Sequence, residues 1–100
     1  MINIALFGLG RIGLMHGKNL MRNSKFNLKY VYDIDQKLAK KAAKRLKAIS
    51  IINPSIAFND KKINGIFISS TTSTHIKFIL ESVKNNKAVF CEKPLDLNIN

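Results

Sequence analysis

The chain has 100 residues, of which 46% are hydrophobic, and a formal net charge of +11 at pH 7. This length suits one domain with a single core, and no stretch approaches the roughly 20 apolar residues of a membrane span. The first apolar run is short, lacks a basic flank and is interrupted by glycines, which argues against a signal peptide. The single cysteine, Cys91, excludes an internal disulfide and suits a reducing compartment, so we expect a cytoplasmic protein.

The positive charge raises the hypothesis of a small nucleic-acid-binding protein, because clustered basic residues attract polyanions. The lysines are spread along the chain, however, with no aromatic residues interleaved for base stacking and no tryptophan. A solvated, lysine-rich surface explains the composition better, and we expect no nucleic-acid partner. The densest basic group falls on the outer side of one predicted helix and consists of Lys37, Lys40, Lys41, Lys44, Arg45 and Lys47.

A glycine-rich turn follows the first predicted strand, an apolar run over residues 2–7 that suits burial in a parallel sheet. The turn reads Gly8-Leu9-Gly10-Arg11-Ile12-Gly13 and opens a predicted helix over residues 11–22. In the pattern G-x-G-x-x-G the first glycine permits a tight turn, the second lets the backbone approach a pyrophosphate, and the third lets the helix pack against the strand. The helix start also offers free N–H groups to phosphates. The pattern predicts a dinucleotide-binding turn whose cofactor-binding residues are Gly8, Gly10, Arg11, Ile12 and Gly13.

One side of this first helix is expected to carry Ile12, Met15, Asn19 and Leu20.

An acidic residue, Asp33, ends the second predicted strand, residues 28–32, and lies 20 residues beyond Gly13. A carboxylate there accepts hydrogen bonds from ribose hydroxyls and repels a 2′-phosphate. The next residue, Ile34, is neither arginine nor serine, so the sequence favours NAD over NADP. The alternative is that Asp33 only caps a turn.

The middle of the chain predicts a helix, a short strand and a helical turn. Asp35 suits the N-cap of the helix, whose apolar residues recur every four positions at Leu38, Ala42 and Leu46. Residues 49–52 predict a short third strand, and Pro54 favours a break before a helical turn over residues 55–58.

The last part of the chain repeats the pattern of strand, loop and helix. Residues 65–69 predict the fourth strand, and the hydroxyl-rich run over residues 69–74 predicts a loop with several candidate N-caps. The helix that follows ends at Asn85-Asn86, and residues 88–91 predict a fifth strand with Glu92-Lys93-Pro94 after it. The apolar residues at helical spacing in that helix are Ile76, Ile79, Leu80 and Val83.

Alternating strands and helices predict an α/β fold, a doubly wound parallel sheet of the Rossmann type with about five strands. In such a sheet the first and fourth strands are neighbours, and ligands bind beyond the carboxyl ends of the strands. We therefore expect residues 1–100 to form an incomplete dinucleotide-binding domain, truncated before a C-terminal substrate domain.

Four parts of the sequence resemble the Gfo/Idh/MocA oxidoreductases, and the similarity runs from Ile2 to Leu97. They are the glycine turn followed by His16, the strand end Val31-Tyr32-Asp33-Ile34-Asp35, the loop Ser69–His75, and Phe90-Cys91-Glu92-Lys93-Pro94-Leu95. The last run is the most specific, and together with the glycine turn it looks most like the inositol 2-dehydrogenase branch.

The resemblance implies a role for each matching residue. Gly8, Gly10 and Gly13 would hold the pyrophosphate of NAD, and Asp33 would hold the adenosine ribose. Ser70 would lie along the nicotinamide side and Glu92 would contact the nicotinamide ribose. Lys93 would be the catalytic lysine that reaches the substrate hydroxyl or carbonyl, with Pro94 in the cis form.

The resemblance also implies a dehydrogenase acting on a polyol or sugar, in which a second domain supplies the substrate pocket and an Asp…His pair. We expect this chain alone to be inactive, and a homo-oligomer only where that second domain is present. The sequence departs from the family at Ser70-Thr71, where Thr-Pro is common. A truncated nucleotide-binding module without catalysis is the alternative function, and the basic nucleic-acid binder ranks below it.

The remaining chemistry-bearing residues suggest no further site. His16 and His75 suit structural or supporting roles, and a cysteine in a strand without an activating partner is more often a packing residue. No His, Cys, Asp and Glu spacing supports a metal site.

Overall fold

The structure, a computed structural model, describes the backbone of residues 1–69 and 72–91 and the side chains of residues 1–69 and 76–91. Its elements in chain order are β1 (Ile2–Phe7), α1 (Arg11–Arg22), β2 (Phe26–Tyr32), α2 (Gln36–Leu46), β3 (Ile49–Ser50), α3 (Ser55–Phe58), β4 (Gly65–Ile68), α4 (Thr72–Lys84) and β5 (Ala88–Cys91).

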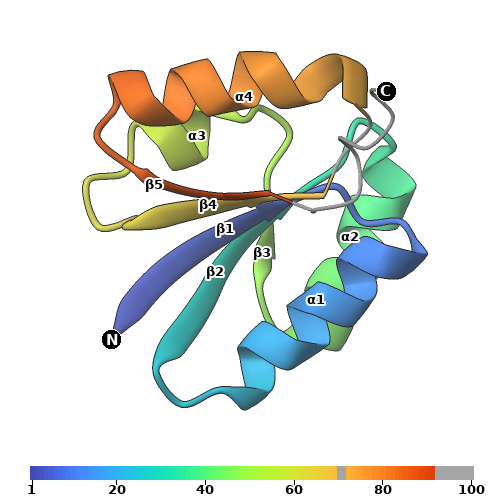
Figure 1. Cartoon of the computed structure of the whole chain (residues 1–100). Helices are drawn as coiled ribbons and strands as arrows, with labels where there is room; N and C mark the ends of the chain where they lie inside the picture. Colours follow the sequence, from blue (N-terminus) through green and yellow to red (C-terminus); the bar gives the residue numbers. More distant parts are fainter. Residues whose placement is uncertain (70–71, 92–100) are drawn as a thin grey trace, which may run out of the picture.

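The strands form one parallel sheet in the order β3-β2-β1-β4-β5 (Figure 1). Helices α1 and α2 cover one face of this sheet, and α3 and α4 cover the other (Figure 1). The predicted doubly wound α/β fold is therefore confirmed, as is the pairing of the first strand with the fourth. Both β1 and β4 point their carboxyl ends toward the glycine turn, which brings the predicted site to one edge.

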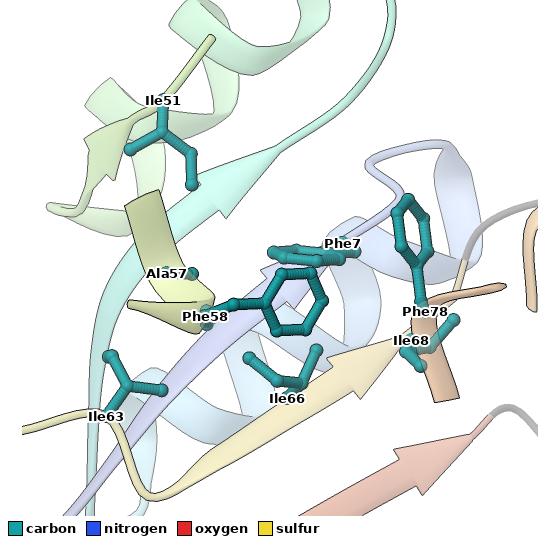
Figure 2. Close-up of a cluster of buried hydrophobic side chains, with 9 residues drawn as sticks. Phe7, Ile51, Ala57, Phe58, Ile63, Ile66, Ile68 and Phe78 are labelled. Carbon is teal, nitrogen blue, oxygen red and sulfur yellow. The ribbon is translucent and has the colours of Figure 1, made fainter. Parts of the chain in front are cut away.

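The core lies on both faces of β1, because successive side chains of a strand point to opposite faces. Ala5 and Phe7 pack beneath α3 and α4, whereas Ile4 and Leu6 pack beneath α1 and α2, and all four are fully buried. Figure 2 shows the cluster around Phe7 on the α3 and α4 side.

Aromatic rings meet edge to face inside this cluster. The Phe7 ring lies 5.5 Å from that of Phe58 and 5.0 Å from that of Phe78 (Figure 2). Edge-to-face pairs at this spacing are favoured by the ring quadrupoles, and they join α3 and α4 to the centre of the sheet.

The predicted side of α1 faces the core only in part, because Leu20 packs against it whereas Ile12, Met15 and Asn19 are exposed. Ile12 and Met15 are 48% and 51% exposed, and the residues of α1 that are buried are Gly13 and Gly17. A Cβ on Gly17 would stand 2.6 Å from the Leu46 side chain, so the helix lies too close to its neighbours for a larger residue to point inward. At this point of α1 a glycine faces the core, and Leu14 and Leu20 pack against the same core cluster.

Most of the apolar residues that the sequence places at helical spacing in α4 do not face the core. Ile76, Leu80 and Val83 are between 62% and 70% exposed, although Ile79 packs against the core. The buried residues are Phe78 and Ser82, and the Ser82 hydroxyl donates to the Phe78 carbonyl at 2.7 Å, which satisfies it without water. Apolar residues surround much of α4, so spacing alone did not identify its inner side.

The boundaries of the other elements follow the predictions with small shifts. β2 begins two residues earlier than expected, β3 is two residues long, and α4 begins at Thr72 inside the predicted loop. The helical turn α3 occupies the predicted residues, and the Asp35 carboxylate caps α2 by accepting from the N–H groups of Lys37 and Leu38. Within the described residues, no helix combines the length and apolar character needed to cross a membrane.

Candidate dinucleotide-binding site

Gly8 begins the turn after β1 with a backbone conformation that favours glycine. Its φ is 99°, in the region that L side chains rarely adopt. The Gly8 N–H donates to the Tyr32 carbonyl at 2.8 Å, which fixes the start of the turn to the end of β2.

Gly13 is required by close packing. A Cβ at this position would collide with the carbonyl group of Gly8, and it would lie 3.6 Å from the Ser69 hydroxyl. The first turn of α1 therefore rests directly on the backbone that leaves β1, and the beginning of the predicted hydroxyl loop lies beside it. The Ser69 N–H donates to the Phe7 carbonyl at 2.7 Å and so extends the pairing of β4 with β1.

Gly10 differs from both, because no contact with the described residues requires a glycine there. Its φ is −69°, which any residue adopts, and a Cβ added there meets no atom within 4 Å. Gly10 is the N-cap of α1, and no side chain caps the helix there. The open space above Gly10 adjoins the unpaired N–H groups of the first helical turn.

Those N–H groups form a positive helix end. The first three residues of α1 are Arg11, Ile12 and Gly13, and their N–H groups have no partner within the helix. There is no acidic side chain in the first turn, and both Arg11 and Ile12 are exposed. This end is therefore free to receive an anion.

The Asp33 carboxylate joins the glycine turn to the loop after β2. One oxygen accepts from the Leu9 N–H and the other from the Asp35 N–H, both at 2.8 Å. Asp33 is half-buried, and each carboxylate oxygen has a second lone pair for a further donor. The capping role that the sequence left open is thus present, and it leaves the carboxylate able to accept from a ligand.

Gln36 is a polar neighbour that the sequence did not indicate. Its Nε2 donates to the Asp33 carbonyl at 2.9 Å, whereas its buried Oε1 has no hydrogen-bond partner among the described residues. A lone glutamine in the first turn of a helix gives no sequence signal, so only the structure associates it with Asp33.

Several predicted site residues lie outside the described part of the chain. They are Ser70, Glu92, Lys93 and Pro94. The structure therefore brings together the glycine turn and Asp33.

The remaining candidates have ordinary surroundings. The His16 ring lies 4.7 Å from the Phe67 ring, and the His75 side chain falls outside the described residues. Cys91 is exposed, which contradicts its expected packing role, and partial desolvation raises the pKa of its thiol. Among the described residues no three His, Cys, Asp or Glu side chains are placed to hold a metal ion.

The comparison with protein families shows the family of the chain. The model of the GFO_IDH_MocA oxidoreductase family, NAD-binding Rossmann fold, matches residues 2–100. The chain belongs to this family. The resemblance found in the sequence is confirmed, and the glycine turn is that of an NAD-binding Rossmann fold.

Relatives of this chain include inositol dehydrogenases. The myo-inositol 2-dehydrogenase of Thermotoga maritima is 32% identical over 98% of this chain and 30% of its own length. The scyllo-inositol 2-dehydrogenase (NAD(+)) of Bacillus subtilis is 33% identical over 98% of this chain and 29% of its own length. The crystal structure of a myo-inositol dehydrogenase from Corynebacterium glutamicum superposes with a TM-score of 0.87 at 36% identity, over 95% of this chain and 28% of that one. This chain therefore spans less than a third of the length of these relatives.

Proposed function

We propose that this chain is the NAD-binding part of a dehydrogenase that transfers a hydride between a hydroxyl-bearing carbon of an inositol-like polyol and nicotinamide. The family supports the oxidoreductase class, and the names of the relatives support the polyol. In this proposal, residues 1–100 form the dinucleotide-binding domain, a further domain supplies the substrate pocket, and the protein works in the cytoplasm.

The observation that carries the proposal is the open space at Gly10. Gly8 and Gly13 are required by backbone conformation and packing, so a purely structural turn would explain them. Gly10 has neither requirement, and it stands directly before the free N–H groups of α1. A pyrophosphate that approaches the backbone at that point would need glycine there.

The remaining cofactor contacts follow from the same edge of the sheet. In this proposal, Arg11, Ile12 and Gly13 offer their N–H groups to the pyrophosphate that Gly8 and Gly10 admit.

Asp33 accepts the hydroxyls of the adenosine ribose, and its charge repels a 2′-phosphate, so we propose NAD rather than NADP. The buried, unpartnered Oε1 of Gln36, next to Asp33, is an acceptor that a ligand donor would satisfy. The residues present thus fit a dinucleotide.

The reacting side of the site rests on the family resemblance. Ser70 lies along the nicotinamide and Glu92 contacts its ribose in this proposal. The ammonium of Lys93 polarises the substrate carbonyl oxygen, or supports the alkoxide as the hydroxyl loses its proton. NAD supplies hydride acceptance at the nicotinamide when it is bound.

Titration of the chain with NADH and with NADPH, followed by nucleotide fluorescence, tests the cofactor. The chain has no tryptophan, which keeps its own emission low. We expect saturable binding with a preference for NADH. Equal affinity for both nucleotides would remove the proposed role of Asp33, and no binding by a folded chain would remove the cofactor assignment.

The Gly10→Ala variant tests the carrying observation. The added methyl group meets no atom of the described residues within 4 Å, so the free energy of unfolding should stay within about 0.5 kcal/mol of the parent's. NADH affinity should fall at least tenfold, since the methyl group occupies the space of the pyrophosphate. A stable variant with unchanged NADH affinity would show that the cofactor does not approach Gly10.

A further inference from the structure

The amino-terminal edge of the sheet carries a second polar feature, opposite the glycine turn. A cleft of about 530 Å³ is lined by residues of the turn between α4 and β5 and of the segment that leads from α3 into β4. These two segments lie at the same end of the sheet (Figure 1). Three of its lining residues are lysines and four are asparagines, and none is acidic. The lysines are Lys61, Lys84 and Lys87.

Lys87 is a buried cation whose charge has no carboxylate partner. The residue is only 8% exposed, and its Nζ donates to the carbonyls of Asp60 at 2.7 Å and Ile63 at 2.8 Å. It forms no ion pair among the described residues. An ammonium has three N–H donors, so the two neutral carbonyls leave one donor and the positive charge unmatched. Buried charges in proteins are usually paired, which makes Lys87 an exception that a bound anion would resolve.

The adjacent carboxylate of Asp60 is already engaged elsewhere. Its Oδ2 accepts from Lys29 Nζ and from the Tyr30 hydroxyl, each at 2.7 Å. These two donors hold the pKa of Asp60 well below its ordinary value, so the carboxylate stays charged and directed at Lys29. The charge of Lys29 offsets that of Asp60, and the cations of the cleft keep their net charge.

The carboxyl end of α4, which borders the cleft, does not oppose an anion as strongly as a bare helix end would. Asn86 has a φ of 58°, and the Asn86 N–H donates to the Val83 carbonyl at 3.0 Å. The Lys87 N–H donates to the Ser82 carbonyl at 2.8 Å. This is the pair of hydrogen bonds of a Schellman motif. The motif gives hydrogen-bond donors to carbonyl oxygens that would otherwise present their partial negative charge to the cleft.

The asparagines add neutral donors. Among the described residues, the Nδ2 groups of Asn59, Asn64 and Asn86 donate to no protein acceptor, whereas that of Asn85 donates to the Glu81 carbonyl at 2.8 Å. Amide and ammonium donors around one space suit an acceptor with several oxygens.

We propose that this cleft binds a small phosphate-bearing polyanion of about the size of a tripolyphosphate. The volume falls within the range of small-molecule sites, about 300–1,000 Å³. Only Phe58 and Ile63 among the lining residues are apolar, so the lining favours a hydrated, charged ligand over an aromatic one.

The cleft lies at the start of β4, where Gly65 pairs with Ile4, whereas the glycine turn follows Phe7, which pairs with Ile68 at the end of β4. Three residue steps of about 3.3 Å separate these two ends of β4. The proposed site is thus separate from the dinucleotide site.

Amide chemical shifts of the isotope-labelled chain, titrated with tripolyphosphate, locate the binding without any variant. We expect saturable shifts over residues 59–64 and 84–88. Shifts confined to residues 8–13 would assign phosphate binding to the glycine turn alone and overturn the proposal. The absence of saturable shifts at millimolar tripolyphosphate would overturn it as well.

Charge-reversal variants separate a built site from general attraction to a basic protein. Lys61 and Lys84 are exposed, so the double variant Lys61→Glu/Lys84→Glu should fold, as circular dichroism would verify. The matched control Lys40→Glu/Lys44→Glu changes net charge equally on the outer side of α2. We expect tripolyphosphate affinity to fall at least tenfold in the first variant and less than threefold in the control.

Equal losses of tripolyphosphate affinity in the two double variants would mean that the ligand is attracted non-specifically to a basic protein, and they would overturn the proposal. An oligonucleotide that displaces tripolyphosphate and binds more tightly, with equal sensitivity to both variants, would favour a nucleic-acid surface instead.

Discussion

Gly10 and Gly13 lie one helical turn apart at the start of α1, and they differ in what an added methyl group would meet. At Gly13 it would collide with the carbonyl of Gly8, which is backbone and cannot rotate away. At Gly10 it would enter open space. The two glycines therefore have different roles, since Gly10 is required by the ligand we propose and Gly13 by the fold.

Replacing Gly13 with alanine should destabilise the protein. The helix would have to move away from β1, and overpacking of this kind costs about 1–3 kcal/mol, which exceeds the gain of about 1 kcal/mol from the better helix former. Urea unfolding of Gly13→Ala beside Gly10→Ala measures the contrast. Equal stability of the two variants would show that α1 does not rest on the Gly8 backbone.

Asp33 has a structural role and a proposed binding role, and cofactor discrimination separates them. In the parent protein, two backbone N–H groups donate to the carboxylate oxygens of Asp33. Asp33→Asn removes the negative charge and replaces one of these oxygens with an NH₂ group. We expect NADH affinity to fall by about 1–3 kcal/mol, the scale of hydrogen bonds to a charged group. The preference for NADH over NADPH should fall as well, because the repulsion of the 2′-phosphate is lost. If Asp33 were purely structural, the substitution would reduce the affinities for NADH and NADPH equally. The ratio of the two dissociation constants distinguishes these cases.

At the scale of elements, β2 contains a bulge whose side chains bind the segment after α3. The register of β1 against β2 shifts between Ile4 and Ala5, so that Lys29 is an extra residue in β2. Successive side chains of a regular strand point to opposite faces, and a bulge relaxes this alternation. Lys29 and Tyr30 consequently both reach the same oxygen of Asp60.

The Asp60 cluster predicts a dependence of stability on acid. Its hydrogen bonds hold the pKa of Asp60 below the ordinary 3.8, so the carboxylate contributes stability above that value and loses it as pH falls further. The thermal midpoint of the parent should therefore drop between about pH 5 and pH 2, and Asp60→Asn should start lower and drop less. Glu81→Gln, which removes a carboxylate outside this cluster, serves as the control. An Asp60→Asn variant with the same acid profile as the parent would contradict the prediction.

The contrast between Phe78 and Leu80 tests which side of α4 faces the core. Phe78 is 7% exposed and contacts Phe7, whereas Leu80 is 64% exposed. Phe78→Ala should cost about 3–5 kcal/mol, and Leu80→Ala should stay within about 0.5 kcal/mol of the parent. Denaturant titration gives both values. A large loss of stability in Leu80→Ala would mean that the side of α4 with Ile76, Leu80 and Val83 is the buried one.

The order of elements was predictable from the sequence because short apolar runs bounded by turn residues, such as residues 2–7 and 65–68, favour strands of a parallel sheet. The glycine turn and Asp33 were predictable for the same reason, since each directly follows such a run. The inner sides of α1 and α4 were not. In α1 the close approach is made by Gly17, a residue without a side chain, and in α4 the buried Ser82 satisfies its own hydroxyl. Spacing rules count large apolar residues and detect neither case.

At the scale of the whole molecule, the described residues supply the adenosine and pyrophosphate end of the proposed site more fully than the nicotinamide end. The edge formed by β1, β2 and α1 carries the glycine turn and Asp33, where the adenosine and pyrophosphate would lie. The relatives are more than three times as long as this chain, and the family resemblance implies a further domain that supplies the substrate pocket and an Asp…His pair. Binding and turnover should therefore depend on different parts of the protein.

Lys93 tests that division in a protein of the relatives' full length that carries this domain. Lys93→Ala should leave NADH affinity within about threefold of the parent's, because the proposed pyrophosphate and ribose contacts belong to other residues. Turnover of an inositol substrate should fall about 10²–10⁴-fold, the usual contribution of a positioned acid or base. Fluorescence titration and steady-state kinetics on one preparation give the two numbers. If affinity and turnover fell together, Lys93 would be a cofactor ligand, and the group that acts on the substrate would have to come entirely from the other domain.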